Sequence, residues 1–447
     1  MVMKQTGKAF YGAFIHSLGA QEVEIIANGL IILDASGKII SLSKDVTPDE
    51  LSEVSSKGIH IEKLKRGELF VPGFIDTHNH APQWAQRGMG REYEILEWLN
   101  TVTFPHESRF EDPAYARRVY ALLVEGFLKQ GVTTASYYGS LHCEATKILA
   151  DICLEKGQRA LVGKCNMARE CPGYYSDKSN ATSLQETEEL INHIHTIDPE
   201  GSLVKPVLTP RFAICCDEEL LAGLGNIAKR DPSTMIQTHF VEARQEIART
   251  KELFPQFSNE ADLYESFGLF NDHTIMAHCI WPTDYEVDRM LQRNIGVAHC
   301  PVSNTTGGEW GAAPIRRYLD LGMKVGLGTD SGGGFSSSIL DAMRQAIITS
   351  NARQTHSDGK EKTLSVTEVF HLATLGGAKV CCLDDKIGSF AVGKDFDALR
   401  ISMLPETGGA SSMVEDEDGV EVMFEKFVMT GDDRNIASVY VRGRSVK

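Results

Sequence analysis

Three histidines and one aspartate stand at or next to the ends of short apolar runs, where they could bind a metal ion. His78 and His80 follow FVPGFID, His239 lies near the end of TMIQTHF, and Asp330 ends MKVGLGTD. If the first run is a strand, His78 and His80 project from the same face, because side chains alternate along a strand. Three imidazoles and a carboxylate suit a divalent ion, with zinc the first candidate and iron the second.

Further residues near these positions could act on a water molecule and a substrate. A bound divalent ion lowers the pKa of water from 15.7 to about 7. Asp330 could take a proton from that water, and Glu242, three residues after His239, could protonate a substrate nitrogen. His278, near the end of HTIMAHC, could orient the attacking oxygen by a hydrogen bond. We therefore expect catalytic roles for Glu242, His278 and Asp330.

A second His-x-His triplet serves as an internal control for this interpretation. His193 and His195 lie in ETEELINHIHTID, a stretch with helical character. Residues two apart on a helix diverge by roughly 200°, so their side chains do not share one ion easily. We expect this pair to lie on a solvated helix face.

The spacing of the apolar runs predicts the elements that position these residues. Between residues 71 and 384, β-rich runs alternate with helical stretches, which is typical of repeated βα units. One helix is clearly delimited, since Asp112 can cap it, Pro113 suits its first turn and Gly131 can end it. The pattern predicts a (β/α)8 TIM-like barrel with its site at the carboxyl ends of the strands. The expected strands are 70–78, 131–138, 159–167, 204–212, 234–240, 273–279, 295–301 and 323–330.

Both ends of the chain have a different pattern, with short strands and turns but few helical stretches. Residues 1–70 and 385–447 could pair into one small β-sandwich domain, beside a barrel domain at 71–384. Composition alone does not establish that pairing.

Composition limits which partners the protein could bind and in which cellular compartment it could work. The net charge of −16 should repel nucleic acid and anionic lipid surfaces. No run approaches the roughly 18 apolar residues of a membrane helix. The ten cysteines show no CxxC spacing or disulfide framework, so we expect reduced thiols in a cytoplasmic protein. A small, uncharged substrate fits these properties.

Several motifs resemble those of the amidohydrolase superfamily, and more closely its guanine deaminase family. The superfamily resemblance lies in PGFIDTHNHAPQ, QTHFVE, MAHC, AHCPVSN and GLGTD. The closer resemblance lies in APQWA, ILEWLNTVTFPHE, VKPVLTPRF, QTHFVEARQE, LATLGGA and TGDDRNIASVYVRGR, which span most of the chain. The resemblance implies hydrolysis of guanine to xanthine and ammonia, supports a β-domain built from both chain ends, and implies a homodimer.

The resemblance also assigns roles to individual residues. It implies zinc ligation by His78, His80, His239 and Asp330, and purine binding by Gln83, Arg211, Phe212, His239 and Glu242. Donors and acceptors on Gln83 and Arg211 suit the polar edges of guanine, while Phe212 can cover a ring face.

The expected number of metal ions follows from the fourth strand. Binuclear relatives bridge two ions with a modified lysine at the end of that strand, where this chain has Thr209-Pro210-Arg211. Lys205 stands at the opposite end of the strand, so we expect a single ion. The chain departs from the family pattern at Asn79, in GKCNMARECPG and in SGGGFSSS, which affects only local contacts in this interpretation.

Two other functions are compatible with the sequence. The nearest is another aminohydrolase on the same scaffold, acting on cytosine, a thioether adenosine, an oxidised purine or a triazine. The second is a non-catalytic scaffold that has lost its metal, although every expected ligand position is filled here. The base that is turned over, together with metal content, distinguishes the three.

Overall fold

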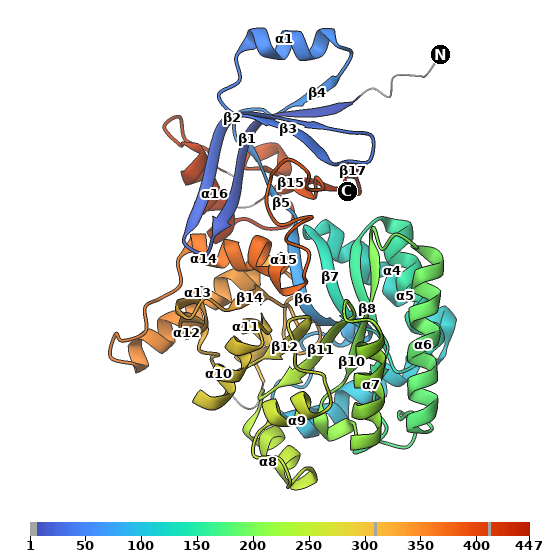
Figure 1. Ribbon diagram of the computed structural model, residues 1–447. Coiled ribbons are helices and arrows are strands. Elements are labelled where there is room, and N and C mark those ends of the chain that lie inside the picture. The colour runs from blue at the N-terminus through green and yellow to red at the C-terminus, as the bar shows by residue number, and fades with distance from the viewer. Residues whose placement is uncertain (1–6, 308–310, 410–412) are drawn as a thin grey trace.

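The computed structural model, which describes residues 7–307, 311–409 and 413–447, contains a parallel barrel with a smaller sheet beside it (Figure 1). Each of the eight expected runs contains a strand, and the strands pair in parallel in chain order, which confirms the expected barrel. A short extra strand, β9 (Cys165–Asn166), pairs with β10. The eight main strands are β6 (Phe74–His80), β7 (Val132–Tyr138), β8 (Arg159–Gly163), β10 (Val204–Pro210), β11 (Met235–Phe240), β12 (Thr274–His278), β13 (Gly296–His299) and β14 (Lys324–Leu327).

Hydrogen bonds join β6 to the end of β14 and to the loop after it, and they bring the last strand of the barrel next to the first. The Thr77 hydroxyl donates to the Leu327 carbonyl at 2.8 Å, and the Asp330 amide donates to the His78 carbonyl at 2.9 Å. Gly328 permits this approach, because a Cβ there would lie 3.0 Å from the His78 carbonyl oxygen. Closure therefore places Asp330 beside His78, although the two are at opposite ends of the barrel sequence.

Helices cover the outside of the barrel (Figure 1). The delimited helix forms as expected: Asp112 accepts the Ala114 amide at 2.8 Å, and Gly131 follows with a positive φ of 83°. No helix in the described ranges is long and apolar enough to cross a membrane. The helices after the strands are α4 (Pro113–Lys129), α5 (Cys143–Lys156), α6 (Asn180–Ile197), α7 (Glu218–Arg230), α8 (Arg244–Leu253), α9 (Glu260–Ser266), α10 (Asp284–Gln292), α11 (Pro301–Asn304), α12 (Ile315–Asp320), α13 (Ile339–His356), α14 (Val366–His371) and α15 (Gly377–Val380).

The connection between β6 and β7 is long and contains several short helical turns before α4. Its residues Ile95, Trp98 and Leu99 line the cavity described below. The turns are η1 (Ala81–Gln86), α2 (Ile95–Trp98), the π-helical turn η2 (Leu99–Thr103), α3 (Phe104–Glu107) and η3 (Ser108–Glu111).

Both chain ends contribute to the smaller sheet, as expected. The strands from the two ends meet where β5 pairs antiparallel with β15, and the expected sandwich takes the form of one hydrogen-bonded sheet. Its core is aromatic: the Phe10 ring stacks on Phe396 at 4.4 Å and meets Phe70 edge-on at 5.3 Å. The strands are β1 (Lys8–Gly19), β2 (Glu22–Leu33), β3 (Ile39–Ser43), β4 (His60–Lys63), β5 (Glu68–Pro72), β15 (Ala398–Ser402), β16 (Ile436–Val441) and β17 (Arg444–Ser445), with helices α1 (Pro48–Ser56) and α16 (Val420–Thr430).

Candidate active site

The four predicted metal ligands meet at the carboxyl ends of the barrel strands. Ligand atoms of His78, His80 and His239 all lie within 4.8 Å of one another. The Nε2 atoms of His80 and His239 are 3.0 Å apart, and Asp330 Oδ1 lies 3.5 Å from His78 Nε2 and 3.8 Å from His80 Nε2. His278 stacks beside His239, with ring centroids 5.4 Å apart. The barrel thus converges residues from β6, β11, β12 and the end of β14 on one point.

Hydrogen bonds orient three of these rings toward that point. The Nδ1 atoms of His78, His239 and His278 face acceptors at 2.6–2.7 Å: Gln237 Oε1, the Arg211 carbonyl and Asn304 Oδ1, respectively. Because these oxygens only accept, each Nδ1 carries the proton and each Nε2 keeps its lone pair. The Nε2 atoms of His78 and His278 are buried and have no hydrogen-bond partner. Several lone pairs directed at one point fit a cation.

The electrostatic environment keeps the ligands in the form that binds metal. Burial, with a further contribution from the neighbouring histidines, lowers the pKa of His80 and His239 well below its ordinary value. Burial raises the pKa of Asp330, but its interactions with the histidines around it, His78, His278 and His80, outweigh burial and hold it well below its ordinary value. Neutral imidazoles beside an ionised carboxylate are the state that a divalent ion requires.

Strained backbone is concentrated around the same point. Val241, His278, Cys279 and Asp330 have positive φ angles of 44°, 72°, 48° and 44°. Such angles are uncommon for residues other than glycine, and unusual for a β-branched residue such as Val241. Strain of this kind persists where the surrounding contacts hold it and is frequent at active sites.

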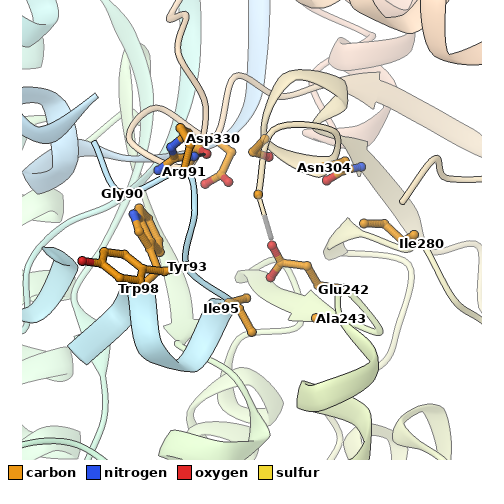
Figure 2. Close-up of a pocket in the computed structure, with 13 residues that line it drawn as sticks. Gly90, Arg91, Tyr93, Ile95, Trp98, Glu242, Ala243, Ile280, Asn304 and Asp330 are labelled. Carbon is orange, nitrogen blue, oxygen red and sulfur yellow. Dashed lines mark hydrogen bonds between the residues drawn. The ribbon is translucent and has the colours of Figure 1, made fainter. Parts of the chain in front are cut away.

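Two adjoining cavities open onto the ligand cluster. The inner one contacts His80, His239 and Asp330, and the outer one borders Glu242, Asn304 and Asp330. Figure 2 shows the Glu242 and Asp330 side chains reaching into the outer cavity from different loops. Glu242 lines both cavities, and its Oε1 lies 3.5 Å from His278 Nδ1. The proton-transfer candidate therefore stands beside both the ligand cluster and the space for a substrate.

The predicted purine contacts line the inner cavity. Gln83, Arg211 and Phe212 all border it, together with the apolar side chains of Ile95 and Leu99. Gln83 and Arg211 are almost fully buried, at 1% and 2% exposed. A cavity lined by apolar side chains and a few fixed polar groups is typical of a small-molecule site.

Comparison with known proteins agrees with this arrangement. A family model described as the amidohydrolase family matches residues 69–446. The chain is 42% identical to a probable guanine deaminase of Schizosaccharomyces pombe, over 99% of this chain and 84% of that protein. It is 38% identical to the guanine deaminase of Dictyostelium discoideum, over 98% of each. The chain belongs to the guanine deaminases of the amidohydrolase family.

A solved guanine deaminase has the same architecture. The crystal structure of guanine deaminase from C. acetobutylicum, with guanine bound in its active site, superposes with a TM-score of 0.90 at 34% identity. The superposition covers 99% of this chain and all of that one. The barrel and the small sheet of this deaminase chain are therefore shared with that enzyme as a whole.

The deaminase site also contains residues that the sequence analysis did not assign. Gln237 and Asn304 hold the rings of His78 and His278. Glu107 is fully buried and accepts hydrogen bonds from Gln83 and Arg211, which line the inner cavity, and Glu246 accepts the backbone amide of Glu242 at 2.8 Å. Glu107 is the last residue of the motif ILEWLNTVTFPHE, and Glu246 is the last residue of QTHFVEARQE. Both motifs indicate the family, but the sequence alone assigns no role to either glutamate.

The second His-x-His triplet lies on a helix, as expected. His193 and His195 belong to α6, and His193 Nε2 pairs with Asp151 Oδ1 at 2.7 Å. Lys205 lies near the start of β10, whereas Arg211 follows its end, so no lysine side chain begins at the position of a bridging ligand. Both observations agree with the sequence-based expectations.

Proposed function

We propose that this protein hydrolyses guanine to xanthine and ammonia with the aid of a single zinc ion. In this proposal His78, His80, His239 and Asp330 hold the ion, which when bound activates a water molecule as a nucleophile. The observation that carries the proposal is the convergence of Nε2 lone pairs and one carboxylate beside a cavity lined by Gln83, Arg211 and Phe212, in a member of the guanine deaminase family.

Three side chains move or hold protons during the reaction. Asp330 accepts a proton from the water, and the lone pair on His278 Nε2, directed by Asn304, accepts the hydrogen bond that orients it. As water adds to the carbon that bears the amino group, Glu242 protonates the neighbouring ring nitrogen. Asp330 then passes its proton to the amino group, the C–N bond breaks and ammonia leaves. The added hydroxyl loses its proton to Glu242 and becomes the new carbonyl of xanthine, so both carboxyl groups return to their starting states and guanine and water are converted to xanthine and ammonia.

The pocket walls bind and orient the base. Arg211 and Gln83 provide fixed polar contacts, Phe212 covers a ring face, and His239 and Glu242 border the same cavity. Burial of these groups strengthens their hydrogen bonds with a neutral base and excludes bulk water from the reacting carbon.

The proposal extends to the setting in which the protein works. We place it in the cytoplasm as a homodimer, without a nucleic-acid or membrane partner. Ten free cysteines and a net charge of −16 support the setting, and the family resemblance supports the dimer. Light scattering after size exclusion tests the dimer, since a monomeric mass contradicts it.

Metal content and substrate turnover, measured on one preparation, test the reaction. We expect about one zinc per chain and faster ammonia release from guanine than from adenine, cytosine or S-adenosylhomocysteine. Iron in place of zinc would correct the metal assignment, and another preferred base would identify the alternative aminohydrolase. Purified protein with neither metal nor activity would indicate the non-catalytic scaffold.

A pair of variants tests the ligand set directly. His80→Ala should lose metal and activity together, because it removes one of three imidazoles that face the site. The matched His193→Ala should retain both, because His193 pairs with Asp151 on the outside of the barrel. Equal behaviour of the two variants would refute the ligand assignment.

A further inference from the structure

Glu107 is a buried carboxylate that joins two walls of the substrate pocket. It is fully buried at the end of α3 and accepts hydrogen bonds from three side chains. Arg211 donates to both of its oxygens, through Nη1 to Oε2 at 2.8 Å and through Nη2 to Oε1 at 3.2 Å. Gln83 Nε2 donates to Oε1 at 2.8 Å, and the Tyr175 hydroxyl donates to Oε2 at 2.7 Å. Gln83 and Arg211 therefore share one carboxylate oxygen and lie side by side.

The carboxylate determines which end of the Gln83 amide faces the pocket. An ionised carboxylate accepts hydrogen bonds but cannot donate them, so the NH2 end of Gln83 must face Glu107. The other end, Oε1, is buried and has no hydrogen-bond partner. Gly332 confines it, because a Cβ there would lie 2.5 Å from Oε1. Because Gln83 lines the inner cavity and this buried acceptor has no partner, it points to a ligand that donates a hydrogen bond.

We propose that Glu107 is a specificity-determining residue that fixes the polarity of the substrate pocket. Through it the pocket presents an acceptor, Gln83 Oε1, beside a donor, the Arg211 guanidinium. This pair complements a ring N–H next to a carbonyl, the lactam edge of guanine. The same pair is mismatched to an edge that has an unprotonated ring nitrogen next to an amino group. The inference rests on the proposed function and explains how the same site selects its purine.

A base with the reversed edge is rejected because it leaves buried polar groups of the pocket without hydrogen-bond partners. An amino group facing Arg211 sets donor against donor, and a bare nitrogen facing Gln83 Oε1 sets acceptor against acceptor. Sites built around buried hydrogen bonds reject mismatched ligands by about 10⁴-fold to 10⁵-fold, since the polar groups lose their partners. The suitable probe is 2,6-diaminopurine, which retains the reacting amino-bearing carbon of guanine and reverses only the lactam edge.

Glu107→Gln is the decisive variant, because an amide at position 107 can donate as well as accept. Gln83 can then turn over and present its NH2 end to the pocket. We expect the ratio of kcat/KM for guanine to that for 2,6-diaminopurine to fall by at least about tenfold. Competitive inhibition constants provide the same ratio where turnover is slow. If both substrates lose activity equally, Glu107 has only a structural role and the inference is wrong.

Two further variants separate specificity from stability. The double variant Gln83→Glu with Glu107→Gln retains one carboxylate near Arg211 and presents only acceptors at position 83. It should recover the preference for guanine relative to Glu107→Gln alone, and a failure to recover it would overturn the inference. Tyr175→Phe removes a donor from Glu107 but leaves the carboxylate, so the ratio should stay unchanged. Wild-type protein that does not deaminate guanine would refute the proposed function itself.

Discussion

Glu242 lies beside both the cavities and the cluster of histidines, where it could transfer a proton to a bound substrate. Its carboxylate lines both cavities and lies 3.5 Å from His278 Nδ1. Glu242→Gln should lower turnover by at least about 10²-fold, because an amide cannot deliver the proton that the substrate nitrogen requires. Metal content should stay at the wild-type value, because the proposed ligands are other residues. Steady-state kinetics with metal analysis provide the measurement, and near-normal turnover would exclude Glu242 from the proton transfer.

Among individual residues, the sequence predicts those whose position is set by a strand. His78, His239 and Asp330 could be found because each stands at the end of an apolar run, and the barrel brings such ends together. Glu107 could not be assigned in the same way. Its environment is made by Gln83, Tyr175 and Arg211, which come from three separate segments. The roles of all these residues stay predictions until variants test them.

At the scale of elements, the loop between β11 and α8 has to hold Glu242 in place. Val241 has a strained φ of 44°, and its amide donates to Glu260 Oε2 at 3.3 Å. Glu246, in the first turn of α8, accepts the amides of Glu242 at 2.8 Å and Ala243 at 3.1 Å through one oxygen. The buried carboxylates therefore anchor the backbone that carries Glu242, the proposed catalytic side chain.

We expect Glu246→Ala to lower kcat by about 10-fold to 100-fold with a much smaller change in KM, because small displacements of a reacting group are costly. Glu246→Gln retains an acceptor and should recover most of the loss. The control is Glu252→Ala on the same helix, where the side chain is exposed and pairs with Arg249. Steady-state kinetics on the three variants test the effect. Equal kcat in Glu246→Ala and wild type would show that the loop needs no such anchor.

Whole elements were easier to predict than the connections between them. The barrel strands are apolar runs of ordinary length, and α4 has clear start and stop residues, so pattern alone locates them. The π-helical turn Leu99–Thr103 and the strand β9 depend on packing in the assembled barrel. No periodicity in the sequence indicates them, although the π-helical turn borders the inner cavity through Leu99.

At the scale of the whole molecule, buried polar contacts join the barrel to the small sheet. Arg159 on β8 donates to Asp395 Oδ2 at 2.9 Å and to Asp397 Oδ2 at 3.1 Å. The Ser17 hydroxyl of β1 lies 2.7 Å from His371 Nδ1 at the end of α14. The similar patterns of the two chain ends left their pairing open and the family resemblance supported it, whereas nothing in the sequence predicted these cross-contacts. The boundaries at 70/71 and 384/385 stay predictions, which limited proteolysis can test.

The burial of His371, which lies beside Ser17, predicts how stability responds to acid. Burial, with a smaller contribution from Lys379, lowers the pKa of His371 to about 4. The unfolded chain, with an ordinary value near 6.5, therefore binds a proton more readily than the folded one. The stabilising contribution is complete above about pH 6.5 and is lost as the pH falls toward 4. Between pH 7.5 and pH 5 the loss amounts to about 2 kcal/mol.

His371→Gln removes this titration, so the free energy of unfolding should fall less steeply between pH 7.5 and pH 5 than in the wild type, by about 2 kcal/mol. Urea unfolding at the two pH values measures the difference. Other buried histidines contribute to the pH dependence of both proteins. The test therefore compares how steeply the free energy of unfolding changes with pH in the variant and in the wild type. Exposed His356, at the end of α13, provides the control, and His356→Gln should retain the wild-type slope. Parallel slopes for His371→Gln and wild type would show that protonation of His371 does not weaken the contact between barrel and sheet.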